Sequence, residues 1–156
     1  MAGVITPDLR VPDFDLPAST GETISLESYR GKVSLVLLFT PDLKASLRIL
    51  RRFNERLGDF DAATSQVLAV AAVVAGELRE FADENDLALP LLSDVRGSIT
   101  QELNLEHACH PVVIVVDQEG RIRESITYPD AHVEGILDHI RRLRGEPDLE
   151  TGAALV

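Results

Sequence analysis

The chain has 156 residues, of which 45% are apolar and 26% are charged, a balance typical of one globular domain. Its formal net charge of −11 argues against nucleic-acid binding, because the average field would repel a phosphate backbone. No segment has the roughly 18 apolar residues that cross a bilayer, and residues 1–11 lack the pattern of a secretory signal. A single cysteine, Cys109, excludes an internal disulfide and fits a reducing compartment, so we expect a cytoplasmic protein.

Two short N-terminal stretches alternate between apolar and polar residues. They lie at residues 14–16 and 23–26, with a turn at residues 19–22 between them, and this pattern predicts a β-hairpin. Residues 33–39 form an almost unbroken apolar run. Such a run is typical of a central strand that is covered on both faces.

A helix is expected directly after this strand. Thr40 suits a helix cap and Pro41 suits the first turn, and apolar residues then recur at helical spacing as far as Leu57. Gly58 predicts the end of this helix. A second apolar run at residues 67–74 predicts a second buried strand, so strand, helix and strand form a βαβ unit.

The remaining elements complete an α/β pattern. A βαβ unit followed by an antiparallel strand pair and a terminal helix predicts a thioredoxin-like fold, with a central mixed β-sheet flanked by helices and an N-terminal β-hairpin. We assign this domain to residues 1–145 and expect residues 146–156 to form a flexible tail. The later elements are expected at residues 77–85 (helix), 87–92 (extended), 98–103 (helix), 112–117 and 121–127 (strands) and 130–144 (helix).

Five stretches resemble the peroxiredoxins of the AhpC/TSA and bacterioferritin-comigratory type, in the order and with the gaps of that family. The resemblance covers roughly residues 11–145 and implies the thioredoxin-like fold. The stretches are VPDFDLP (11–17), TISL with YRGK (23–32), VLLFTP (36–41), LLSDVRG (91–97) and VVIVVDQEGRI (112–122).

In that family the chemistry depends on a P-x-x-x-T-x-x-C motif, whose thiolate attacks a peroxide and becomes a sulfenic acid. The resemblance places Pro41 at the proline, Ala45 at the threonine and Arg48 at the cysteine. Pro111 falls where the family has a second arginine. A guanidinium cannot replace a thiolate, because it cannot attack oxygen and cycle through a sulfenic acid.

We therefore interpret the chain as a peroxiredoxin-like protein without the peroxidatic cysteine, and as non-catalytic. The former active-site pocket is predicted to serve binding, either of a small anion or of a protein partner. Relatives of this fold often form dimers, so a homodimer is one possible assembly. The residues predicted for this pocket are Thr40, Pro41, Ala45, Ser46, Arg48, His110 and Pro111.

Cys109 supports an alternative interpretation, a thiol-dependent antioxidant oxidoreductase that acts as a peroxidase or in thiol exchange. The resemblance places its loop opposite the active-site helix, and a protonated imidazole of His107 or His110 would favour a thiolate. The contrary interpretation is a small, partly buried residue without chemistry. Because these three side chains lack the spacing of a zinc site, we expect no metal and no cofactor.

Residues 43–57 carry a local charge of +4 in this acidic protein. Lys44, Arg48, Arg51, Arg52 and Arg56 oppose Glu55 alone. One interpretation is an anion site near a helix N-terminus, and the other is a solvated face that forms salt bridges with neighbouring acids. Elsewhere, Asp94 and Asp117 are expected to cap strand ends and turns.

Overall fold

The computed structural model describes residues 10–105, 108–127 and 132–143. The N-terminal hairpin is present: β1 (Asp15–Pro17) pairs antiparallel with β2 (Thr23–Ser25), and Leu16 lies opposite Ile24. A single turn of 3₁₀ helix, η1 (Leu26–Ser28), leads from it toward the central sheet. The predicted N-terminal hairpin is therefore confirmed.

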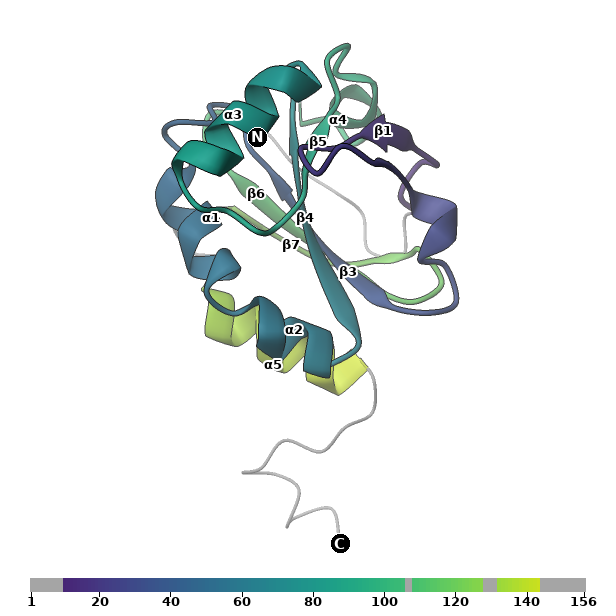
Figure 1. Cartoon of the computed structure of the whole chain (residues 1–156). Helices are drawn as coiled ribbons and strands as arrows, with labels where there is room; N and C mark the ends of the chain where they lie inside the picture. The colour runs from purple at the N-terminus through teal and green to yellow at the C-terminus, as the bar shows by residue number, and fades with distance from the viewer. Residues whose placement is uncertain (1–9, 106–107, 128–131, 144–156) are drawn as a thin grey trace, which may run out of the picture.

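The central sheet has five strands in the order β5-β4-β3-β6-β7 (Figure 1). Its middle strand, β3, pairs parallel with β4 and antiparallel with β6, so the sheet is mixed, as the sequence pattern predicts. The β3–α1–β4 part of the chain is the expected βαβ unit. The strands are β3 (Ser34–Phe39), β4 (Ser65–Ala71), β5 (Leu91–Ser93), β6 (Val112–Val116) and β7 (Ile122–Thr127).

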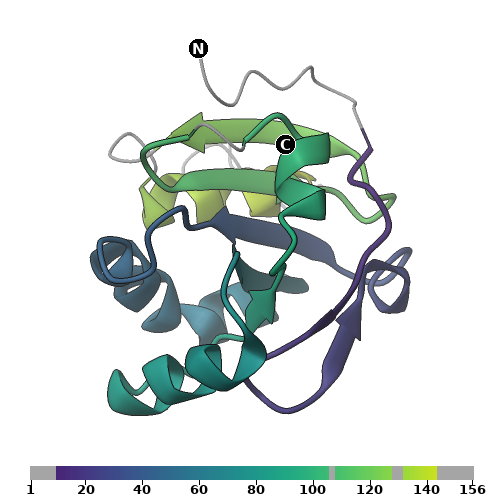
Figure 2. The same cartoon turned by 90° about the horizontal axis from the view of Figure 1, so that it is seen from above.

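Helices and the hairpin cover both faces of the sheet (Figures 1 and 2). Even-numbered residues of β3, such as Val36, pack with four helices in one core, whereas odd-numbered residues, such as Leu37, pack with α4 and the N-terminal segment. Strand residues alternate between the faces, so a fully apolar run supplies both cores. The helices are α1 (Leu47–Asn54), α2 (Leu57–Ala62), α3 (Ala75–Glu84), α4 (Ser98–Glu102) and α5 (Val133–Leu143).

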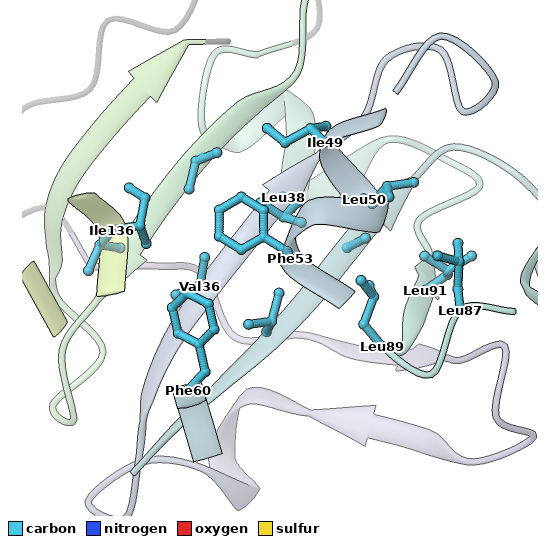
Figure 3. Close-up of a cluster of buried hydrophobic side chains, with 14 of the residues drawn as sticks. Val36, Leu38, Ile49, Leu50, Phe53, Phe60, Leu87, Leu89, Leu91 and Ile136 are labelled. Atoms are coloured by element: carbon cyan, nitrogen blue, oxygen red, sulfur yellow. The ribbon is translucent and has the colours of Figure 1, made fainter. Parts of the chain in front are cut away.

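Two phenylalanines anchor α1 and α2 in the first core. Phe53 of α1 and Phe60 of α2 are fully buried, and their rings stack with centroids 5.7 Å apart (Figure 3). Ile136 of α5 belongs to the same core. An aromatic pair of this kind stabilises a core beyond the area that it buries, so it holds α1 against α2.

The start and end of the first helix differ from the prediction. The chain forms turns over residues 41–46, and α1 begins only at Leu47, because the Thr40 hydroxyl bonds to the Val70 carbonyl instead of capping a helix. The predicted stop at Gly58 is wrong, since α1 ends at Asn54 and Gly58 lies inside α2. Burial of Phe60 accounts for this second short helix.

Smaller differences concern element ends. Strand β4 starts earlier and ends earlier than the predicted run at residues 67–74, and the buried hydroxyl of Ser65 donates to the Phe60 carbonyl at its start. The last helix falls within the predicted 130–144, but residues 128–131 and the predicted tail lie outside the described residues. None of the helices that the structure describes has the length and hydropathy of a membrane-spanning helix.

Candidate functional site

The carboxyl ends of the parallel strands β3 and β4 meet at one edge of the sheet. Thr40, the residue after β3, is buried, and its backbone N–H and its hydroxyl both donate to the Val70 carbonyl at 3.0 Å. These two bonds hold the start of the following turn against β4. In α/β sheets, ligands bind beyond the carboxyl ends of parallel strands, so a ligand site is expected at this edge.

A small cavity, which we call the strand-end pocket, lies at this edge and has a volume of about 220 Å³. It is smaller than the 300–1,000 Å³ typical of ligand pockets, and none of the described residues that line it is titratable. The hydroxyls of its two threonines, Thr40 and Thr100, donate to the Val70 carbonyl and the Asp94 carboxylate. The pocket therefore suits a small uncharged group. It is lined by Phe39, Thr40, Pro41, Val70, Ala71, Ala72, Gly97, Thr100, Gln101, Leu105 and Ala108.

Asp42 organises the turn that connects Pro41 to α1. Its carboxylate accepts the Ala45 N–H at 3.2 Å, and its backbone carbonyl accepts both the N–H and the hydroxyl of Ser46, at 3.0 and 2.6 Å. Ser46 is buried, whereas Ala45 is exposed. The Ser46 hydroxyl thus has a structural role in the turn, and Ala45 presents only a methyl group.

Arg48 is the second residue of α1 and is exposed. It does not line the strand-end pocket; it lines a separate groove of about 570 Å³ between α1 and the first turn of α5. We call this the arginine groove. Its lining residues are Leu47, Arg48, Arg51, Arg52, Glu55, Arg56, Val133 and Glu134.

Two of the arginines in the groove have partners. Arg56 bonds to the carboxylate of Asp59 at 2.6 Å and to the carboxylate of Glu134. The hydrogen bond to Asp59 is the main cause of the raised pKa of Arg56, and the neighbouring charge of Glu134 adds to it. Arg51 donates to the side-chain oxygen of Asn85 at 3.2 Å. Arg56, at the start of α2, therefore links α2 to α5.

The loop before β6 carries the remaining predicted residues. Pro111 is buried at the start of β6, while Cys109 and His110 are exposed. Neither Cys109 nor His110 lines the strand-end pocket, although Ala108, the residue before Cys109, does. His107 lies outside the described residues, and no metal-binding group of side chains occurs among the residues that are described.

The predicted site residues thus lie in different places. Thr40 and Pro41 line the strand-end pocket, and Arg48 lines the arginine groove. Ala45, Ser46, His110 and Pro111 line neither cavity. Sequence reasoning missed the far wall of each cavity: Gly97, Thr100 and Gln101 in the pocket, and Val133 and Glu134 in the groove. Only their position at helix starts near predicted strand ends could have indicated them.

The mixed five-stranded sheet, the covering helices and the N-terminal hairpin define a thioredoxin-like protein. The sequence model described as "AhpC/TSA family" matches residues 7–125, more than half of the chain. The chain therefore belongs to the AhpC/TSA family.

Known relatives agree with this assignment. Two Mycobacterium tuberculosis proteins with "peroxiredoxin" in their names are 32% identical to the chain over 91 residues. That alignment spans 58% of this chain and only 58% of those relatives. The thioredoxin-like protein YneN of Bacillus subtilis is 26% identical over 118 residues, which cover 74% of this chain and 68% of YneN.

Solved structures show the same fold. Peroxidoxin BcpB from M. tuberculosis superposes with a TM-score of 0.80 and 20% identity, over 89% of this chain and 98% of that protein. The mitochondrial 2-Cys peroxiredoxin of Plasmodium falciparum superposes with a TM-score of 0.79 and 16% identity, over 95% and 98% of the two chains. At these identities, the likeness concerns the fold alone.

Proposed function

We propose that this AhpC/TSA-family protein has no thiol peroxidase activity and functions by binding a ligand. The observation that carries the proposal is Arg48, the residue at the position of the family's reactive cysteine, in the first turn of α1. Peroxidatic chemistry needs a sulfur that attacks the peroxide and accepts an oxygen atom. A guanidinium stays protonated at all relevant pH values and has no such reactivity.

Other positions of the family motif support the same conclusion. Ala45 stands where the family motif has a hydroxyl, and Pro111 stands where it has a second arginine. The strand-end pocket provides no titratable group among the described residues that line it. The site therefore lacks the thiol, the hydroxyl and the cation with which the family motif activates a peroxide, whereas the exposed guanidinium of Arg48 suits an anion.

One observation favours a second candidate, a thiol-dependent oxidoreductase. Cys109 is exposed and directly follows Ala108, which lines the strand-end pocket. In this alternative, the Cys109 thiolate would attack a hydroperoxide to give a sulfenic acid and an alcohol, and an external thiol would reduce the sulfenic acid. No second cysteine exists in the chain to form a resolving disulfide, so the first proposal is preferred.

Peroxide consumption with dithiothreitol as reductant tests both candidates. We expect the wild type to consume hydrogen peroxide no faster than glutathione at the same concentration, and Cys109→Ser to behave in the same way. Mass spectrometry should show no preferential sulfenic acid at Cys109. Rapid turnover that is lost in Cys109→Ser would overturn the proposal and support the alternative.

The remaining assignments stay predictions. A lone cysteine fits the reducing cytoplasm, where we place the protein. The ligand is a small anion or a protein partner, and a homodimer is measurable by sedimentation. The domain boundary at residue 145 is likewise a prediction.

A further inference from the structure

The outer face of α1 departs from two electrostatic rules for stable helices. Arg48 and Arg52, both in α1, lie four residues apart, a spacing at which like charges repel on a helix. The first turn of α1 contains no acidic residue and instead carries Arg48, near the positive end of the helix dipole. Because the chain has 26 acidic residues, this choice does not reflect a shortage of carboxylates. Such departures from local rules are expected at functional sites.

Two guanidinium groups in the arginine groove are available to a ligand. Arg56 is bound by Asp59 and Glu134, and Arg51 bonds to Asn85. In contrast, Arg48 and Arg52 form no ion pair or hydrogen bond with any side chain among the described residues, and both are exposed. Their donors therefore face solvent from adjacent turns of one helix face.

The groove has a charge that matches one phosphate group. Arg48 and Arg52 together carry a charge of +2, whereas Arg56 is already bound by Asp59 and Glu134. A phosphate monoester carries a charge of about −2 near neutral pH, and arginine forks match its oxygens in geometry. Residues four apart on a helix have Cβ atoms about 6 Å apart, so two long side chains reach one phosphate.

We propose that the arginine groove binds a phosphate monoester attached to a small apolar body. Arg48 and Arg52 hold the phosphate, and the half-buried side chains of Leu47 and Val133 lie beneath the body. The groove volume of about 570 Å³ lies within the range of small-molecule sites. This inference rests on the proposed function, in that it names the ligand of a binding protein.

Glu55 and Glu134 limit what else the groove accepts. Their carboxylates repel further negative charge, so a ligand with one anionic end is favoured over an extended polyphosphate chain. The net charge of −11 also opposes nucleic acid.

Isothermal titration with phenyl phosphate tests the inference, with inorganic phosphate, benzoate and phenol as comparison probes. We expect saturable binding of phenyl phosphate, weaker binding of inorganic phosphate and benzoate, and none of phenol. Arg48→Gln and Arg52→Gln should each weaken phenyl phosphate binding about tenfold or more, since each removes a charge-assisted hydrogen bond. Arg79→Gln, which removes the same charge from the exposed face of α3, is the matched control and should change affinity less than about twofold.

Three outcomes would overturn the inference: no saturable binding of phenyl phosphate at millimolar concentration, an equal loss in Arg79→Gln, or binding of inorganic phosphate as tight as that of phenyl phosphate. Circular dichroism confirms that each variant is folded. The peroxide assay on the same samples separates the two proposals. Phosphate binding together with peroxide turnover would contradict only the proposed function, whereas absence of both would contradict only the groove assignment.

Discussion

The helices α4 and α1 both follow a strand of the central sheet, yet their N-termini are stabilised in opposite ways. Before α4, the buried carboxylate of Asp94 accepts the backbone N–H groups of Ser98, Ile99 and Thr100 at 3.0, 3.2 and 3.3 Å. At α1, the first turn carries the cation Arg48 and no acid. The N-terminus of α4 is arranged for stability, whereas the charge at the N-terminus of α1 opposes stability. A charge near a helix start can therefore either satisfy the backbone, as Asp94 does, or oppose the helix dipole, as Arg48 does.

The largest expected effect on stability concerns the inner face of α1, which is apolar and buried in the core, whereas the outer face is charged and exposed. Phe53→Ala should lower the free energy of unfolding by about 4 kcal/mol, because it removes a fully buried ring that stacks on Phe60. Urea denaturation measures this change. Arg52→Ala, on the exposed face next to it, is the control and should change the free energy by less than about 0.5 kcal/mol. A loss of similar size in both variants would contradict the division of α1 into two faces.

The next effect concerns the N-terminus of α4. Asp94→Ala should cost about 3 kcal/mol of stability, because it leaves the buried N–H group of Ile99 and the part-buried N–H groups of Ser98 and Thr100 without an acceptor. Asp94→Asn keeps one oxygen acceptor and should cost less. Asp42→Ala, which removes a single exposed acceptor before α1, should cost about 0.5–1 kcal/mol. Urea denaturation of the three variants should show this order. A greater loss of stability in Asp42→Ala than in Asp94→Ala would contradict the difference between the two helix N-termini.

Arg48→Glu is expected to stabilise the N-terminus of α1. Arg48→Glu places an acid in the first turn of α1 and removes one repulsive pair, so it should raise the free energy of unfolding by about 0.5–1 kcal/mol. The same variant should lose phenyl phosphate binding. Thermal unfolding and titration measure the two effects. Loss of stability in Arg48→Glu would mean that Arg48 supports the fold, and the functional interpretation of its charge would fail.

The smallest expected effect is a pH dependence of stability that arises from His139 in α5, the helix that faces α1 across the arginine groove. Burial lowers the pKa of His139 below its ordinary value of 6.5, although Glu124, 3.6 Å away, acts in the opposite direction. Because the unfolded chain then binds a proton more readily, this histidine costs no stability above pH 6.5, and the free energy of unfolding falls as the pH drops from 6.5 toward the lower folded pKa.

Urea denaturation of the wild type and His139→Gln between about pH 7.5 and 5.5 isolates this contribution. The wild type should lose more stability over that interval than the variant does. An equal loss in both proteins would show that His139 titrates normally.

Much of the fold was predictable because local patterns report burial directly. The apolar runs ending at Phe39 and at residue 116 could only be strands covered on both faces, and the structure places them in the middle of the sheet. The start of α1 was not predictable, because Thr40 could cap a helix or bond across to Val70. That choice depends on a strand 30 residues away in the sequence.

Only the α1 side of the arginine groove was predictable from the sequence. The charge of residues 43–57 is visible in the sequence, and so is the loss of the family's cysteine at position 48. Which of these cations are neutralised is not visible, since Arg56 finds its partner Glu134 78 residues later. The sequence left an anion site and a salt-bridged face as alternatives. In the structure Arg56 is salt-bridged, whereas Arg48 and Arg52 form no ion pair among the described residues.

By itself, then, the sequence determined the α/β layering, the family resemblance and the absence of a thiol at the start of α1. Only the tertiary structure decided that α5 closes a groove over the arginines and that α4 closes a small pocket beside Thr40. The physical reason is that periodicity encodes which face of an element is buried. It does not encode which distant element covers that face, because this depends on how side chains from the whole chain pack together.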